Sequence, residues 1–379
     1  MKIGFLAYSL MVLEGYWNKL HGKADCWWGV TNPQIYDLLK KKNIDNVVYH
    51  HDELIIDHKK THGNKYVSNN PWHSERTVAE RIKPDIWIAD TLNKLNNVRK
   101  DAFWVQTFHT LPIKKLFFYP PVLEYDLLLL PGEYHRQEII KRLNIKEKDE
   151  ERLKVVGWPR TDDFFNGKFD RNEIVNTLGL DPNLKTIMYA PTWGWGYGNE
   201  RLFARWFDRE VEVFEQMCYE IRKMDLNFIV KLHSLSFQVS NQTLIDIAKK
   251  YNVLWLTKEL SCFVDDPNPF LWITDILISD LSGIIAEFMV LDRPIIYIEP
   301  DEKLDAWNGS DMPKNFRVGH VVSSPDELLC AIDDSIKYPE KFKKQRRDLV
   351  SKLFNSPDGK AMDRSVQEIL NFAESKGLY

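Results

Sequence analysis

Short runs of consecutive apolar residues alternate along the chain with amphipathic stretches of helical period. Such runs, bounded by polar turns, are typical of strands buried on both faces of a parallel sheet. In the N-terminal half the expected strands are Lys2–Tyr8, Asn46–Tyr49, Asp85–Ala89, Phe103–Gln106 and Leu127–Leu130. In the C-terminal half they are Thr186–Tyr189, Leu226–Leu232, Val253–Leu256, Ile276–Ile278 and Ile295–Ile298. With amphipathic helices expected at Gln34–Lys42 and Glu210–Met224, the pattern predicts an α/β protein of repeated βα units.

Two domains are the expected organisation, because 379 residues exceed what one hydrophobic core normally holds. Repeated βα units in both halves predict two doubly wound, Rossmann-like domains that face each other across a central cleft. We expect an N-terminal domain at 1–165, an interdomain crossing at 166–184 and a C-terminal domain at 185–379. The charged helical region after Pro325 could return to the N-terminal domain.

Composition narrows the class of protein. A formal net charge of −4 argues against a general nucleic-acid binder, which needs a strong positive field. No apolar run approaches the length of a membrane-spanning helix, and the strand-like start at Met1 is unlike a signal peptide. The four cysteines are scattered without metal or redox spacing, which is typical of reduced thiols. A cytoplasmic protein is therefore expected.

The stretch from Ile276 to Ile298 forms a strand–turn–helix–strand pattern with a polar turn at Ser279–Gly283. Hydroxyl groups and free N–H groups at the start of a helix favour an anion. The turn therefore predicts a phosphate-binding site. The alternative is that Ser282 is only an N-cap and Gly283 only a tight turn.

Two histidines also follow expected strands directly, and ligands of doubly wound sheets bind at the carboxyl ends of strands. His109 follows Phe103–Gln106, and His233 follows Leu226–Leu232. Each is a candidate acid or base, because imidazole titrates near neutral pH. The alternative for each is a structural histidine at a strand end. The other eight histidines lack such a context and are expected at the surface, with no metal site.

Six short motifs, taken in chain order, resemble those of the CDP-glycerol glycerophosphotransferase family, whose members build teichoic acids and related capsular polymers. The motifs are Gln106–Lys115, Gly157–Asp162, Tyr189–Trp193, Lys231–His233, Ser279–Ser282 and Asp358–Ala361. The chain departs from the usual family residues at Phe108, Thr110, Leu111, Ser234, Gly283 and Met362. The resemblance implies a GT-B fold, with the acceptor on the N-terminal domain and the CDP-linked donor on the C-terminal one.

The implied reaction is attack of an acceptor hydroxyl on the β-phosphorus of a CDP-alditol, most simply CDP-glycerol, with CMP leaving. Phosphoryl transfer needs positioning, charge stabilisation and a proton acceptor. On this resemblance His109 is the general base, and His233 contacts the pyrophosphate. No cofactor and no metal are expected.

Residue type and position suggest further candidates besides these two histidines. The candidates for holding the donor diphosphate are Thr192, Ser279, Ser282 and Gly283. Glu287, one turn along the following helix, is placed to take ribose hydroxyls, and its alternative is an exposed helix charge. The further candidates for phosphate or acceptor binding are Arg160, Asp358, Lys360 and Arg364.

The acceptor is expected to be a polymer or a lipid-linked hydroxyl. The basic segments Leu111–Phe118 and Tyr338–Phe354 could contact the inner membrane surface, although a solvated helix face is the commoner explanation. Two other functions stay open. The first is a nucleotide-sugar glycosyltransferase or 2-epimerase of GT-B fold. The second is a non-catalytic nucleotide-binding protein.

Overall fold

A computed structural model describes most of the chain. The described residues are 1–6, 10–50, 71–90, 102–108, 118, 120–191, 211–232, 242–256, 266–280, 282–298 and 317–378. The chain forms two compact units. Unit 1 comprises Met1–Pro112, Leu116–Asp162 and Lys352–Tyr379, and unit 2 comprises Ile113–Lys115 and Asp163–Ser351. The domain limits expected from the sequence stay a prediction.

Unit 1 is built on a parallel sheet in the order β3-β2-β1-β4-β5-β6-β7. Its described strands are β1 (Lys2–Leu6), β2 (Asp25–Val30), β3 (Val47–Tyr49), β4 (Ile86–Ala89), β5 (Phe103–Gln106), β6 (Leu127–Leu130) and β7 (Leu153–Val155). The strand order reverses between β1 and β4, which is where doubly wound sheets bind ligands. The central strands are buried on both faces, as continuous apolar runs predict.

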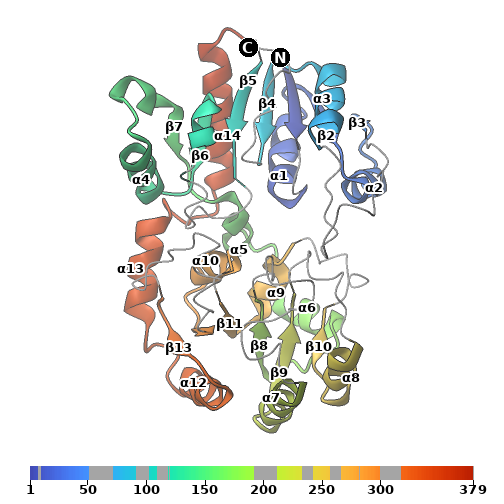
Figure 1. Cartoon of the computed structure of the whole chain (residues 1–379), viewed down its shortest axis with the longest axis vertical. Helices are drawn as coiled ribbons and strands as arrows, with labels where there is room; N and C mark the ends of the chain where they lie inside the picture. The colour runs from blue at the N-terminus through green and yellow to red at the C-terminus, as the bar shows by residue number, and fades with distance from the viewer. Residues whose placement is uncertain are drawn as a thin grey trace, which may run out of the picture. The chain divides into compact units, whose positions relative to one another are not determined.

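Helices cover both faces of this sheet (Figure 1). They are α1 (Leu10–Leu20), α2 (Pro33–Lys41), α3 (Pro71–Ile82), α4 (Glu133–Leu143) and α14 (Ala361–Ser375), with 3-10 turns at Pro120–Glu124, Glu147–Arg152 and Pro159–Thr161. Apolar side chains of α1, α2 and α14 share one core with β1, β2 and β4. The last helix of the chain, α14, therefore belongs to the N-terminal unit, where it contacts α1 and β6.

Unit 2 repeats this plan with a parallel sheet in the order β10-β9-β8-β11-β12-β13. Its described strands are β8 (Lys185–Tyr189), β9 (Leu226–Val230), β10 (Leu254–Trp255), β11 (Ile276–Ser279), β12 (Ile295–Ile298) and β13 (His320–Val322). Its helices are α5 (Asp162–Phe165), α6 (Arg171–Thr177), α7 (Val211–Lys223), α8 (Gln242–Lys250), α9 (Asn268–Ile273), α10 (Ile284–Met289) and α12 (Pro325–Lys337). Helix α13 (Lys343–Leu353) leads back to unit 1. Apolar residues of α7, α8 and α12 form one core with the strands.

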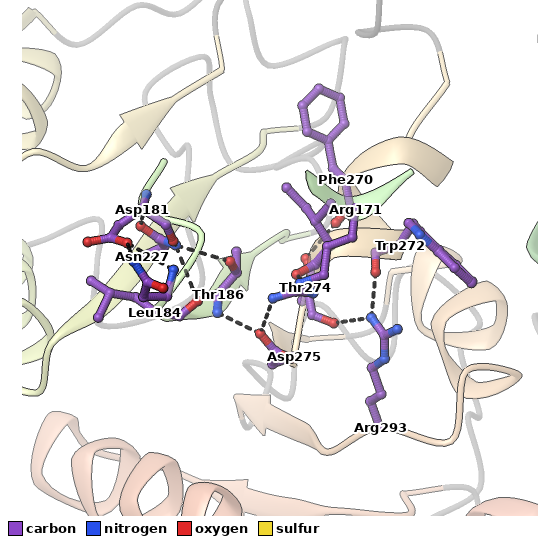
Figure 2. Close-up of polar contacts among 12 residues, drawn as sticks. Arg171, Asp181, Leu184, Thr186, Asn227, Phe270, Trp272, Thr274, Asp275 and Arg293 are labelled. Atoms are coloured by element: carbon purple, nitrogen blue, oxygen red, sulfur yellow. Dashed lines mark hydrogen bonds and ion pairs between the residues drawn. The ribbon is translucent and has the colours of Figure 1, made fainter. Parts of the chain in front are cut away.

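A polar network joins the amino ends of the unit 2 strands (Figure 2). The Asp275 carboxylate, just before β11, accepts hydrogen bonds from Arg171 and from the Thr186 N–H, both at 2.7 Å. Arg293, just before β12, donates to the carbonyl oxygens of Trp272 and Thr274 at 2.6 and 2.7 Å. Burial lowers the pKa of Arg293. This network lies at the amino ends of the strands, opposite to the carboxyl ends where a doubly wound sheet binds its ligand. It therefore stabilises the fold and is not part of the candidate ligand site.

The predicted fold class is confirmed: both units are doubly wound α/β structures, and every strand expected from the apolar runs is present within two residues of its expected limits. The sequence analysis did not identify the strands β2, β7 and β13 or the helices α1, α3, α4, α6, α8 and α9. Within the described ranges, no helix combines the length and the apolar character that crossing a bilayer requires.

Candidate functional site

The Ser279–Gly283 turn lies at the point in unit 2 where the strand order reverses. β8 and β11 are neighbours in the sheet, and β9 and β12 lie on their outer sides. The carboxyl ends of β8 and β11 are therefore adjacent, and each continues into a motif recognised in the sequence, Tyr189–Trp193 and Ser279–Ser282. This is the position at which a doubly wound sheet binds its ligand.

The two serines of this turn differ in their surroundings. Ser279 is fully buried, and its hydroxyl donates a 2.6 Å hydrogen bond to the Ala190 carbonyl oxygen, which joins the ends of β11 and β8. Ser282 is partly exposed, and its hydroxyl forms no hydrogen bond with any residue that the structure describes. Ser282 can therefore meet a ligand, whereas Ser279 shapes the strand ends.

Gly283, rather than Ser282, is the N-cap of α10, with right-handed angles of φ −58° and ψ −26°. The first turn is tight, since Ile285 N–H donates to Ser282 and Ala286 N–H donates to Gly283. No capping hydrogen bond from the Ser282 hydroxyl is present among the described residues, so the alternative of Ser282 as only an N-cap has no side-chain contact to support it. Without a side chain at Gly283, nothing from that residue covers the start of the helix.

Two carboxylates are buried at this edge. Asp280 follows β11 directly and is 2% exposed, and Glu287 on α10 is 3% exposed. The alternative that Glu287 is an exposed helix charge is therefore wrong. Asp280 was not singled out from the sequence, although it lies inside the Ser279–Ser282 motif. A buried carboxylate is kept only where it makes specific polar interactions, and both residues have interactions of their own.

Three of the candidate residues, His109, Thr192 and His233, lie outside the described residues. The strands that lead to them are described. β5 ends at Gln106, three residues before His109, and β9 ends at Val230, three residues before His233. Both histidines therefore follow the carboxyl ends of parallel strands, as the sequence analysis expected, one in each unit.

The motifs at 157–162 and 358–364 come together in unit 1. The Asp162 carboxylate accepts hydrogen bonds from Ala361 N–H at 3.1 Å and Met362 N–H at 2.7 Å, the first residues of α14. A carboxylate at a helix N-terminus satisfies unpaired N–H groups and interacts favourably with the helix dipole. Asp162 thus caps a helix that begins 199 residues later in the chain.

Arg364 adds further hydrogen bonds at this junction between the motifs at 157–162 and 358–364. Its guanidinium donates to the carbonyl oxygens of Val156 and Ser356 at 2.7 and 3.1 Å, and to both oxygens of Asp358 at 3.0 and 2.9 Å. Gly157 has φ +96°, and a Cβ there would lie 2.9 Å from the Arg364 guanidinium, so the close approach requires glycine.

Asp358 and Arg364 were candidates for phosphate or acceptor binding, but their contacts favour a structural role. Partial burial acts to raise the pKa of Asp358, but the hydrogen bonds from Arg364 and the Lys360 N–H outweigh it and lower this pKa. The Arg364 donors are directed at protein acceptors. Lys360 is exposed, and Arg160 is half-buried and has interactions of its own. The Asp358–Arg364 pair therefore holds the junction, and Lys360 is the most accessible cation of the set.

We expect the Asp162 cap to make stability depend on pH. Burial raises the pKa of Asp162 from 3.8 to about 6, although the two N–H donors act in the opposite direction. The native state therefore binds a proton more tightly than the unfolded chain, and this contribution to stability declines as pH rises from about 4 to above 6. Asp162→Asn should destabilise by about 1 kcal/mol more at pH 5 than at pH 7.5.

Urea unfolding of the wild type and Asp162→Asn at these two pH values measures this difference. Asp163→Asn is the matched control, because the neighbouring Asp163 pairs with Lys168 at the surface. Equal pH dependence in the two variants would contradict the assignment.

One histidine differs from expectation. The histidines outside the motifs were expected at the surface, but His135 in the first turn of α4 is fully buried. Its ring nitrogens have no hydrogen-bond partner among the described residues. Burial lowers the pKa of His135 to about 3, so the ring is neutral at pH 7. The polar sequence around it gave no signal of burial, which results from the packing of α4 within unit 1.

Comparison with known proteins shows which family the chain belongs to. The sequence profile of the CDP-Glycerol:Poly(glycerophosphate) glycerophosphotransferase family matches residues 31–371. A teichoic acid poly(glycerol phosphate) polymerase of Bacillus spizizenii is 26% identical over 280 residues, which are 66% of this chain and 64% of that protein. The teichoic acid glycerol-phosphate primase of Bacillus subtilis is 26% identical over 329 residues, 81% of this chain and 77% of that protein.

The first three relatives are longer proteins, of which the chain covers 64%, 38% and 44%. Among solved structures, the wall teichoic acid polymerase TagF matches with a TM-score of 0.68 at 17% identity, over 99% of this chain and 90% of that one. UDP-GlcNAc 2-epimerase from Neisseria meningitidis matches with a TM-score of 0.59 at 13% identity, over 98% and 100% of the two chains. These likenesses establish the GT-B type of fold.

Proposed function

Because the chain belongs to the CDP-glycerol:poly(glycerophosphate) glycerophosphotransferase family, we propose that it transfers an alditol phosphate from a CDP-linked donor to a hydroxyl group and releases CMP. The transferred group is most simply glycerol phosphate, and the acceptor is a polymer or a lipid-linked hydroxyl. The family match over residues 31–371 carries this proposal. The names of the relatives agree with it, since they are glycerol-phosphate or ribitol-phosphate polymerases and primases of teichoic acid synthesis.

In the proposed reaction the acceptor oxygen attacks the β-phosphorus of the donor, and the bond from that phosphorus to the bridging oxygen of CMP breaks. His109 takes the proton of the acceptor hydroxyl, as a group with a pKa near neutral pH can. His233 donates a hydrogen bond to the pyrophosphate, which stabilises the negative charge that CMP gains on leaving. Phosphoryl transfer depends mainly on such positioning and charge stabilisation.

The donor site is proposed at the carboxyl edge of β8 and β11. Ser282 offers a partly exposed hydroxyl, and the start of α10 at Gly283 offers backbone N–H groups. Thr192, three residues after the end of β8 in the sequence, is proposed to contact the same diphosphate. Glu287 is proposed to accept hydrogen bonds from the ribose hydroxyls, a role that suits a buried carboxylate better than an exposed one. Ser279 supports this edge through Ala190.

The structure gives little support for contact between the two basic segments and a membrane. In Tyr338–Phe354 the basic residues are largely paired with acidic ones, such as Lys341 with Asp334 and Lys344 with Asp348. The segment Leu111–Phe118 lies almost entirely outside the described residues. Because paired charges attract an anionic surface less than free ones, Tyr338–Phe354 is a weak candidate for a membrane-binding surface.

Nucleotide preference gives the first test of the proposal. A ligand that binds only the native state stabilises it by about 2.7 kcal/mol at 100 times its Kd. CDP and CMP are expected to raise the thermal unfolding midpoint at concentrations where UDP does not. A UDP preference would instead favour the sugar-nucleotide alternative.

Product analysis then identifies the reaction. Incubation with CDP-glycerol or CDP-ribitol and a polymer acceptor should release CMP in proportion to the alditol phosphate transferred. Release of UDP from a UDP-sugar, or formation of an epimerised sugar, would contradict the proposal. Tight CDP binding without turnover of any CDP-alditol would favour the non-catalytic alternative.

A further inference from the structure

The carboxyl end of β5 holds an unusual backbone turn. Gln106, the last residue of β5, is fully buried and is paired with Ala89 at the end of β4. β4 borders the position where the strand order of unit 1 reverses, so this end of β5 lies near the expected ligand edge. Two residues later, Phe108 has φ +59° and is also fully buried.

A left-handed backbone is disfavoured for a bulky aromatic residue and persists only where its surroundings hold it. Here the Gln106 side chain provides one such contact, because the Phe108 N–H donates a 2.7 Å hydrogen bond to Gln106 Oε1. The strand end itself is held separately. Thr107 N–H and Oγ1 both donate to the Ala89 carbonyl oxygen, at 2.9 and 3.3 Å. The Gln106 amide thus acts on the residue after the anchored strand end.

The backbone angles of Phe108 set the direction in which the chain continues, and the next residue is His109. We propose that Gln106 is a positioning residue for the reaction, which holds Phe108 left-handed and so sets where His109 is presented to the acceptor hydroxyl. This inference rests on the proposed role of His109 as general base. It adds a residue that contacts neither substrate nor the reacting atoms, and it explains why an amide precedes the histidine by three positions.

Three variants separate this role from simple packing. Gln106→Met keeps the length of the side chain but removes the oxygen acceptor, and it should lower kcat for CMP release about 10²-fold, as a displacement of about 1 Å can. KM for the CDP-alditol should stay within about threefold, because the proposed donor residues belong to unit 2. Gln106→Glu keeps an acceptor oxygen and should restore most of kcat. Thr107→Val, which removes a neighbouring hydroxyl bond, is the matched control and should change kcat less than about threefold.

A double-mutant cycle tests whether Gln106 acts through His109. In a His109→Ala background, Gln106→Met should have less than about a twofold further effect, because the side chain that it positions is absent. If Gln106→Met lowers kcat by the same factor in the wild-type and His109→Ala backgrounds, the proposal is overturned. An unchanged kcat in Gln106→Met would also overturn it. By contrast, a His109→Ala enzyme as active as the wild type would refute the assignment of the base itself.

A second measurement does not depend on turnover. The ring proton resonance of His109, identified by its loss in His109→Ala, can be followed by NMR during a pH titration. Gln106→Met should change its chemical shift and titration midpoint, whereas Thr107→Val should leave them close to the wild type. An unchanged His109 resonance in folded Gln106→Met, with folding checked by far-UV circular dichroism, would overturn the positioning role even if no CDP-alditol reacts.

Discussion

Replacing His109 by alanine is expected to lower kcat for CMP release by about 10³-fold, because a positioned general base contributes about 10²- to 10⁴-fold to proton transfer. Binding of CDP should change little, since the proposed donor site belongs to unit 2 and His109 to unit 1. The measurement compares kcat with CDP-glycerol at saturating acceptor, together with the CDP-induced thermal shift. A large loss of kcat with an intact thermal shift is the expected result.

His21→Ala is the control for this experiment. His21 is exposed at the end of α1, where its ring stacks on Trp17, and it has no place in the proposed chemistry. Its replacement should leave kcat within about twofold of the wild type. If His109→Ala behaves like His21→Ala while CMP is still released from CDP-glycerol, another group accepts the proton.

Arg346→Met is expected to destabilise unit 2 by about 3 kcal/mol, because it removes a buried charge that several protein acceptors satisfy. Arg346 is 1% exposed, and its guanidinium donates to the Asp292 carboxylate and carbonyl oxygen and to the Pro339 carbonyl oxygen at 3.0, 3.0 and 3.1 Å. Asp292 lies in the turn between α10 and β12. The loss should therefore loosen the helix that begins at the proposed donor site.

Arg347 provides a matched control at the next position. It contacts the same Asp292 carboxylate at 2.7 Å, but its side chain is 65% exposed. Exposed ion pairs contribute about 0–1 kcal/mol, so Arg347→Met should shift the urea midpoint far less than Arg346→Met does. Equal shifts would show that burial does not decide the contribution of these two arginines.

The strands of both sheets could be predicted from the sequence because parallel strands are buried on both faces and so appear as continuous apolar runs. Leu127–Leu130 and Ile295–Ile298 are such runs, and both are strands with these limits. The strand Asp25–Val30 was missed because Asp25 and Gly29 leave an apolar run of only three residues between them. Its place beside β1 depends on pairing partners distant in the sequence.

The position of the candidate site could also be predicted from the sequence. Motif order indicated the family, and parallel topology then placed Ser279–Gly283 at the strand-order reversal of unit 2. The individual roles were harder to predict. A serine that donates to Ala190 and one that is open to a ligand cannot be distinguished by residue type. Likewise, nothing near Asp162 in the sequence shows that it caps a helix near the C-terminus.

The sequence by itself determined the fold class, the family and the set of residues from which a site can be built, because these depend on hydrophobic period and on local motifs. Only the tertiary structure decided which of those residues are open to a ligand and which stabilise the fold. It buries Glu287 and His135, joins Arg364 to Asp358 and directs the Gln106 amide to Phe108. Burial and hydrogen-bond partners arise from contacts between segments far apart in the chain, and local sequence does not specify such contacts.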